Sequence, residues 1–223
     1  MSTNKKFWIG FGDIHEDLSL LDDVPDLEAA DGVIISGDIT NRGGKRRAAE
    51  LLESICKINP NIYAQIGNMD HAEITSYLDK KGWNIHARGR QLTQSVGIMG
   101  VGYSTPTPFM TPSEVSNAKL AQWINEGYKE VKDLQKLIFV AHDPPFGSKA
   151  ARLSRGENVG NMAVLEFIKR VQPDICLTGH IHEAESEDYI GRTKVINPGM
   201  FSMGGYALIQ LVGEKLEADL MYI

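Results

Sequence analysis

Cysteine is scarce in this chain: only Cys56 and Cys176 occur among 223 residues. Both lie in apolar surroundings, one in an expected helix and one in an expected strand, so we expect two buried, reduced thiols. The scarcity excludes a disulfide framework and argues against a thiolate-rich structural zinc site. Reduced thiols are typical of a cytoplasmic protein, and the cytoplasm is the expected location.

Long apolar runs and a dominant charge of one sign are also missing. No stretch approaches the ~18 uninterrupted apolar residues of a membrane-spanning helix, so no membrane partner is expected. The net charge is −6, with acids and bases spread along the whole length. This balance argues against a nucleic-acid coat or a membrane-surface protein. The N-terminal segment has only a short apolar run before Asp13, unlike a signal peptide.

The sequence also lacks internal repeats, low-complexity tracts and composition breaks that would mark a linker. We therefore expect a single domain over residues 1–223, which is long enough to bury a large core. An oligomer is left open, because the sequence gives no signal for or against one.

What the sequence does contain is a series of short apolar runs. Each is rich in β-branched or aromatic residues and ends near a turn-forming residue, which is typical of a buried strand. The expected strands are residues 7–11, 32–36, 62–66, 96–101, 137–141, 174–178 and 193–197. Helical spacing occurs around residues 48–55, 120–124 and 162–171, and residues 206–223 read as a hairpin. This alternation predicts an α/β fold with helices outside sheet layers.

Polar residues suited to chemistry follow five of these strands, in the segments GDIH, GDIT, GNMD, AHDPP and GHIH. The segments supply Asp13, His15, Asp38, Asn68, Asp70, His142, His180 and His182. Sites in open α/β sheets form beyond the carboxyl ends of strands. We therefore expect these groups to converge, although they span about 170 positions.

The residue types indicate the chemistry. Imidazole and carboxylate without cysteine suit Mn²⁺, Fe or Zn²⁺ rather than Ca²⁺. Without Asp70, the set still offers seven candidate ligands, more than one ion needs. Two divalent ions roughly 3.5–4 Å apart that share one carboxylate would use all seven. Such a pair holds a phosphate by two oxygens and activates a bridging water as the attacking hydroxide, which predicts a metal-dependent phosphoesterase.

In this order the motifs resemble the calcineurin-like metallophosphoesterase superfamily, whose pattern is Asp-x-His, Gly-Asp, Gly-Asn-His-Asp or -Glu, a single His, and Gly-His-x-His. The resemblance extends from Asp13 to His182, about three quarters of the chain, and the turn at 197–199 also looks like the family. It implies a four-layer α-β-β-α sandwich, with two facing mixed β-sheets flanked by helices. It also implies one metal ion on Asp13, His15, Asp38 and His182, and another on Asp38, Asn68, His142 and His180, bridged by Asp38.

One position departs from this resemblance: Met69 stands where most members of the superfamily have histidine. That histidine protonates the leaving group or steadies the transition state, and a thioether does neither. Three readings stay open. His71 substitutes for it, or the leaving group needs little protonation, or the protein is a metal-binding scaffold or regulatory protein with weak or no hydrolase activity.

Two segments are candidates for contact with the substrate. Asn41-Arg42-Gly43 resembles the Asp-Arg-Gly of the superfamily's protein phosphatases, in which arginine binds phosphate. Asn41 and Arg42 are therefore expected to bind substrate, and Arg42 is also expected to assist catalysis. The alternative is a solvated basic turn. Residues 103–113 contain three prolines and are expected to form a stiff wall beside the site.

The favoured substrate is a small phosphodiester, nucleotides included, with a phosphomonoester as the alternative. The second ester oxygen of a diester lowers its charge, so its transition state depends less on the missing histidine. Genomic nucleic acid is not an expected partner.

Overall fold

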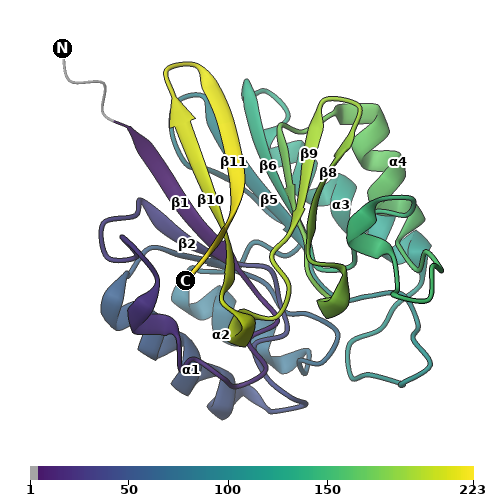
Figure 1. Cartoon of the computed structure of the whole chain (residues 1–223), viewed down its shortest axis with the longest axis horizontal. Coiled ribbons are helices and arrows are strands. Elements are labelled where there is room, and N and C mark those ends of the chain that lie inside the picture. Colours follow the sequence, from purple (N-terminus) through teal and green to yellow (C-terminus); the bar gives the residue numbers. More distant parts are fainter. Residues whose placement is uncertain (1–4) are drawn as a thin grey trace.

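The structure of the chain is a computed structural model that describes residues 5–223. Within this range the chain forms two mixed β-sheets flanked by four α-helices (Figure 1). The strands are β1 (Lys6–Phe11), β2 (Gly32–Ile35), β3 (Ile62–Ala64), β4 (Gly89–Gln91), β5 (Val96–Val101), β6 (Lys136–Ala141), β7 (Ile175–Leu177), β8 (Ser186–Ile190), β9 (Thr193–Asn197), β10 (Gly205–Val212) and β11 (Lys215–Tyr222). The helices are α1 (Lys45–Ile58), α2 (Glu73–Lys81), α3 (Asn117–Val131) and α4 (Met162–Val171).

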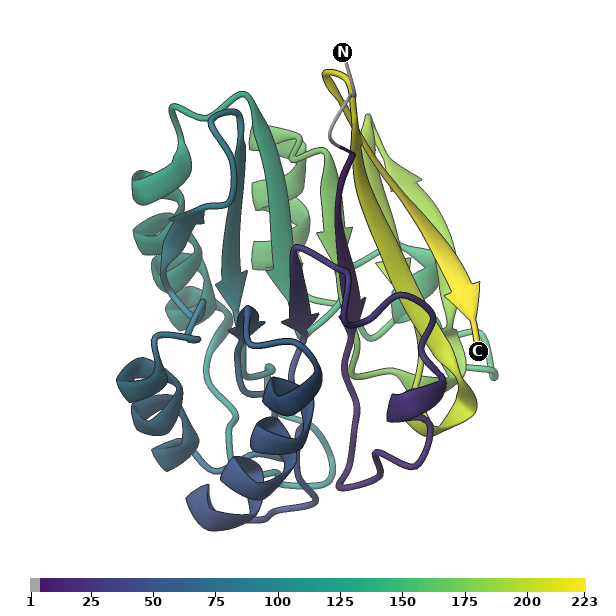
Figure 2. The same ribbon diagram turned by 90° about the vertical axis from the view of Figure 1, so that its left-hand side faces the viewer.

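Both sheets combine parallel and antiparallel strands: the first is antiparallel at its β10–β11 edge, and the second is antiparallel at both edges. The first has the strand order β11-β10-β1-β2-β3 and the second β4-β5-β6-β7-β9-β8. Strands β1 to β3 are parallel, as are β5, β6, β7 and β9. Figure 2 shows these parallel strands pointing the same way in both sheets, so the loops that follow them gather on one side of the molecule.

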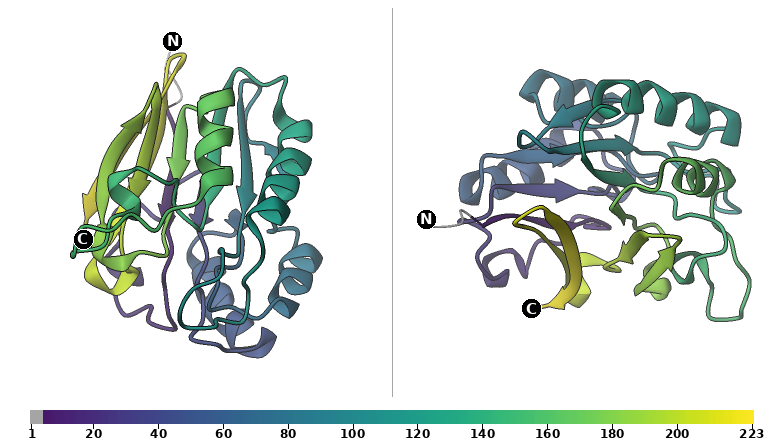
Figure 3. Two further views of the ribbon diagram at one scale, coloured as in Figure 1. Left: turned by 90° about the vertical axis from the view of Figure 1, so that its right-hand side faces the viewer. Right: turned by 90° about the horizontal axis from the view of Figure 1, so that it is seen from above.

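Three apolar layers hold the sheets and helices together. Successive strand residues point to opposite faces, so Ile34 packs between the sheets while Val33 packs on the side of α1 and α2. In the second sheet, Val140 faces the first sheet and Phe139 faces α3 and α4, which lie along its outer face (Figure 3). Burial on both faces explains why the central strands read as continuous apolar runs. The expected α-β-β-α sandwich is confirmed.

The two sheets are in close contact where β1 has a glycine. A Cβ built on Gly10 would lie 2.7 Å from Leu177 Cδ2 of β7, closer than carbon atoms normally pack. Gly10 precedes Asp13 by three residues, and Leu177 precedes His180 by three. The close contact therefore lies just before the two chain segments that carry these polar side chains.

The expected strands, the C-terminal hairpin and three of the helices are present close to their predicted bounds. Helix α2 and strands β4 and β8 were not expected. The two strands lie at the edges of the second sheet, and their sequences, GRQ and SEDYI, lack the apolar alternation of a half-buried strand.

Two expectations about composition can also be compared with the structure. Cys56 and Cys176 are both free thiols; Cys176 is buried as expected, but Cys56 is only partly buried because α1 presents it near its solvent side. Among residues 5–223, every helix is too short or too polar to cross a lipid bilayer.

Candidate metal centre

The polar residues that follow the strands converge at the carboxyl ends of both sheets. Two groups of ligand-type side chains form there, and within each group the ligand atoms lie within 4.8 Å of one another. The first group is Asp13, His15, Asp38 and His182, and the second contains Asp38, His142 and His180. Asp38 belongs to both groups, and the Asn68 amide oxygen contacts both histidines of the second.

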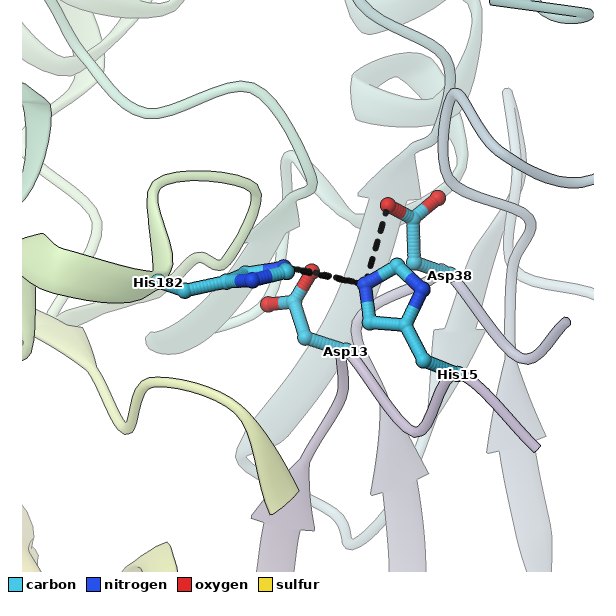
Figure 4. Close-up of side chains that lie close together, drawn as sticks. All are labelled: Asp13, His15, Asp38 and His182. Carbon is cyan, nitrogen blue, oxygen red and sulfur yellow. Dashed lines mark hydrogen bonds and ion pairs between the residues drawn. The ribbon is translucent and has the colours of Figure 1, made fainter. Parts of the chain in front are cut away.

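The first group is built from the loops after β1 and β2 together with His182, which opens a short 3-10 helix after β7 (Figure 4). His182 Nε2 lies 2.9 Å from His15 Nε2 and 3.3 Å from Asp13 Oδ1. His15 Nε2 also lies 3.7 Å from Asp38 Oδ2. Two imidazole nitrogens and two carboxylate oxygens thus face one another, the arrangement that a divalent cation satisfies.

The second group is more deeply buried. His142 Nε2 is 3.4 Å from Asp38 Oδ2 and 2.9 Å from Asn68 Oδ1. His180 Nδ1 is 2.6 Å from the same Asn68 oxygen. Because amide and carboxylate oxygens only accept, each contact requires a positive charge or a proton on the imidazole side.

Neighbouring groups fix the orientation of two of these histidines. Asn41 donates from Nδ2 to the His15 backbone oxygen, which turns its Oδ1 toward His15 Nδ1 at 2.7 Å. His142 Nδ1 lies 3.2 Å from the Ser36 backbone oxygen. In both rings Nδ1 therefore contacts a protein oxygen and Nε2 points into the ligand group, the orientation found in histidines that bind metals.

The Asn68 amide and the Asp38 carboxylate are oriented in the same way. Asn68 Nδ2 donates to Thr111 Oγ1 at 3.0 Å, so its oxygen turns toward His142 and His180. Asp38 Oδ1 accepts the Met69 backbone N–H at 2.7 Å, which leaves Oδ2 for the histidines. The Asp13 carboxylate accepts the His180 backbone N–H at 3.0 Å and so joins the two sheets.

Asp38 and His142 each stabilise the charged form of the other. Burial by itself raises the pKa of Asp38, but the charges of His142 and His15 lower it to about 2. Burial lowers the pKa of His142, and Asp38 outweighs that effect and raises it to about 9. The carboxylate is thus held ionised inside the protein, the state in which it binds a cation.

The backbone at the centre is strained. Asp13, His15, Asp38 and His180 have positive φ angles of 47°, 46°, 49° and 70°. Non-glycine residues adopt this region rarely, and each costs on the order of 1–3 kcal/mol unless its surroundings impose it. Gly67 is required nearby, since a Cβ there would lie 2.1 Å from Asp38 Oδ1. Such strain is typical of functional sites.

Asp70, which closes the GNMD segment, has a different task. Its two carboxylate oxygens accept the backbone N–H groups of Ile39, Thr40 and Gly67 and the Thr40 hydroxyl. Burial and the neighbouring Asp38 charge raise the pKa of Asp70. The side chain fastens the turn that carries Asn68 to the loop that carries Asp38.

The other sequence-predicted residues lie around the centre. Arg42 is exposed and donates from Nη2 to the backbone oxygens of Phe109 and Met110 at 3.0 and 3.4 Å. Asn41 contacts His15, as described above. His71 is exposed, two residues before α2, and belongs to neither ligand group. Substrate binding by Asn41 and Arg42 and catalysis by His71 stay predictions.

Sequence reasoning did not find Thr111 or the use of Asn41 to orient His15. Thr111 lies in the Pro-rich segment 103–113 and is 43 positions from Asn68, so no local pattern announces the contact. The position of Asn41, three residues after Asp38, was the one signal in the sequence that it lies near the ligand groups.

Comparisons with known proteins agree with this geometry. Residues 116–221 match the family model described as metallophosphoesterase, calcineurin superfamily. The chain is 30% identical over 175 residues to the uncharacterised protein MJ1162 of Methanocaldococcus jannaschii, covering 76% of this chain and 77% of that protein.

Solved structures share the fold at low sequence identity. TT1561 of Thermus thermophilus is 20% identical, with a TM-score of 0.71 over 96% of this chain and 98% of that one. A putative 5'-nucleotidase of Staphylococcus aureus is 15% identical, with a TM-score of 0.60 over 99% of this chain and 54% of that one. From the matched family model, the M. jannaschii relative and the shared fold, the chain belongs to the metallophosphoesterases of the calcineurin superfamily.

Proposed function

We propose that this chain hydrolyses a small phosphodiester with two divalent cations held at the two ligand groups that share Asp38. Family membership supports the broader statement, metal-dependent hydrolysis of a phosphoester bond. The single observation that supports the two-ion site is the convergence of seven side chains around one carboxylate. The diester is favoured because Met69 replaces the histidine that would support a more highly charged transition state.

The donor set fits Mn²⁺, Fe or Zn²⁺, because it combines imidazole nitrogens with carboxylate and amide oxygens. Asp13, His15, Asp38 and His182 would hold one ion, and Asp38, Asn68, His142 and His180 the other. When bound, such a pair supplies Lewis acidity toward phosphate oxygens and lowers the pKa of water.

The residues around the centre determine from which side the substrate enters and which group can protonate the leaving group. His182 has 39% of its side chain exposed whereas His142 has none, so the substrate reaches the centre on the His182 side. Met69 contributes its backbone N–H to Asp38 and has no side-chain proton to donate. The leaving group therefore departs unprotonated or takes a proton from solvent or from His71.

The test measures metal content together with two rates. Elemental analysis of the loaded protein should approach two ions per chain, and with Mn²⁺ present bis(p-nitrophenyl) phosphate should be hydrolysed faster than p-nitrophenyl phosphate. Faster turnover of the monoester would reverse the diester assignment. Fewer than two ions at saturation would contradict the shared-carboxylate arrangement.

A second candidate function, a metal-binding scaffold without hydrolase activity, is favoured by Met69 alone. Met69→His discriminates between the two, because a general acid contributes on the order of 10²–10⁴-fold. If the metal-loaded wild type is inert on every phosphoester tested while Met69→His is active, the scaffold function is established.

Cys56 and Cys176 are both free thiols, which supports a cytoplasmic location for either function.

A further inference from the structure

Two exposed apolar side chains belong to the loop that contacts the second ligand group. Phe109 is 76% exposed and Met110 is 81% exposed, at the tip of the segment 103–113 between β5 and α3. Single exposed apolar residues on a surface are ordinary. Phe109 and Met110, however, are consecutive, and several contacts join their loop to the ligand groups.

The backbone beneath the pair is fixed to the second ligand group. Thr111 follows Met110 directly, and its hydroxyl accepts the Asn68 side-chain N–H at 3.0 Å. Ser113 donates its backbone N–H to the Asn68 backbone oxygen at 3.0 Å and its hydroxyl to the Asp70 backbone oxygen at 2.5 Å. The tip is therefore tied to the same turn that carries Asn68.

Two further contacts close the tip into a rigid loop. Glu114 Oε1 accepts the hydroxyls of Thr107 and Thr111, at 2.7 and 2.6 Å, and so joins the two ends of the tip. Arg42 donates to the backbone oxygens of Phe109 and Met110 and links them to the loop that follows Asp38.

These contacts hold Met110 at a φ of 47°, a region that a non-glycine residue adopts only when its surroundings impose it. The loop is thus pre-ordered, so binding there loses little further conformational entropy. Consecutive Cα atoms are about 3.8 Å apart, which places the base of Met110 one residue from a side chain that touches Asn68. The loop is thus close enough to the centre for an ester group of a bound phosphodiester to reach it.

We propose that Phe109 and Met110 form the binding surface for an aromatic or heteroaromatic ester group of the substrate. This inference rests on the proposed function and narrows it to diesters with at least one aromatic ester group. Phenyl rings stack on aromatic groups and thioether sulfur makes favourable contacts with them, whereas a methyl ester would cover little of either side chain.

The kinetic test compares two diesters with the same leaving group, phenyl p-nitrophenyl phosphate and methyl p-nitrophenyl phosphate. We expect the double variant Phe109→Ser/Met110→Ser to lose about tenfold in kcat/KM on the phenyl ester and to keep its rate on the methyl ester. Intrinsic reactivity cancels, because the same two esters are compared in both proteins. Tyr189→Ser, which removes a 62% exposed aromatic residue from edge strand β8, is the matched control and should change neither rate.

Methionine methyl NMR provides a readout that does not require turnover. Of the 8 methionines, Met69 reports on the ligand groups and Met110 on the loop tip, and Met69→Leu and Met110→Leu assign the two signals. We expect the phenyl ester to shift both signals and the methyl ester to shift Met69 alone.

Each other outcome contradicts the inference in a distinguishable way. If both esters shift Met69 and neither shifts Met110, the aromatic surface is refuted and the diester site survives. If neither signal moves and no ester is cleaved, both the proposed function and the inference are refuted. If the Met110 signal shifts with protein concentration in the absence of ester, a second copy of the chain covers the pair instead.

Discussion

The two ligand groups that meet at Asp38 differ in depth and in the way their members are held. In the first group, the side chains of His182 and His15 are 39% and 11% exposed, whereas His142 of the second group is fully buried. A side chain in contact with water is re-solvated when an ion leaves, but a buried one is left without a partner. If two ions bind as proposed, the second group should hold its ion more tightly than the first.

The supporting contacts differ in the same direction. In the first group, the orientation of His15 depends on one exposed side chain, Asn41. In the second, His142 is oriented by the Ser36 backbone oxygen and Asn68 by Thr111, which is itself held by Glu114. A site built on backbone groups and a tied loop is more rigid than one built on a single side chain, and rigidity favours retention of the ion.

The largest expected effect removes the residue that both groups share. Asp38→Asn keeps the shape of the side chain but removes its charge, so both ions should be lost and hydrolysis should fall by about 10³-fold. Elemental analysis and rates on bis(p-nitrophenyl) phosphate measure the two consequences. Asp22→Asn, which neutralises an exposed acid, is the matched control. Retention of two ions by Asp38→Asn would show that the groups bind independently.

Removing one histidine from each group tests the difference in depth. In the metal-free protein, His142→Ala leaves Asp38 buried without its partner, and we expect it to lower the free energy of unfolding by about 3 kcal/mol. His182→Ala removes a partly exposed group and should lower it by less than about 1 kcal/mol. Urea denaturation measures both values. Equal losses would contradict the comparison between a buried and an open group.

Removing the two orienting side chains tests the groups separately. Asn41→Ala should weaken the ion of the first group, and Thr111→Val the ion of the second, each by about tenfold, as is usual when a contact that orients a ligand is lost. Competition with a chromophoric chelator would resolve the two affinities. If Thr111→Val weakened both ions equally, the loop 103–113 would support the whole centre.

The smallest expected effect is a pH dependence of stability that comes from His86, a histidine outside the centre. Burial lowers the pKa of His86 to about 4, against 6.5 in the unfolded chain, although Asp79 and Glu126 raise it and Arg88 and Lys119 lower it further. The folded state therefore disfavours the proton, so stability that is present above pH 6.5 is lost as the pH falls toward 4. By pH 5.5 the loss should be about 1 kcal/mol.

His86→Gln keeps an acceptor for the Gly102 backbone N–H and removes this titration. Measured on metal-free protein, the difference between wild type and His86→Gln isolates His86, because the histidines of the centre titrate in both. Parallel stability curves between pH 7.5 and 5.5 would assign the whole pH dependence to the two ligand groups.

The sequence was sufficient for the central strands of both sheets and for the set of polar residues at the strand ends. Strands such as β2 and β6 are buried on both faces, so their composition alone identifies them. The edge strands β4 and β8 were missed, because a strand that faces solvent needs no apolar pattern and is defined by its neighbour.

The same limit applies to the centre. The strand-end residues follow strands with a strong apolar signal, and the sheet topology then brings them together. Thr111 and Asn41 act through contacts 43 and 26 positions away, which depend on how two irregular loops fold back. A local sequence pattern predicts which ligand residues follow a strand, but it does not predict which loop residue orients their side chains.

Gly10 links the packing between the two sheets to the strands that lead to the centre. Strand β1 leads into Asp13 and strand β7 leads into His180, and the two strands are in contact where Gly10 meets the end of the Leu177 side chain. One methyl group added to Gly10 would force that side chain to move. A substitution inside the apolar layer, several residues away from any ligand, would thus first disturb the two strands on which Asp13 and His180 depend.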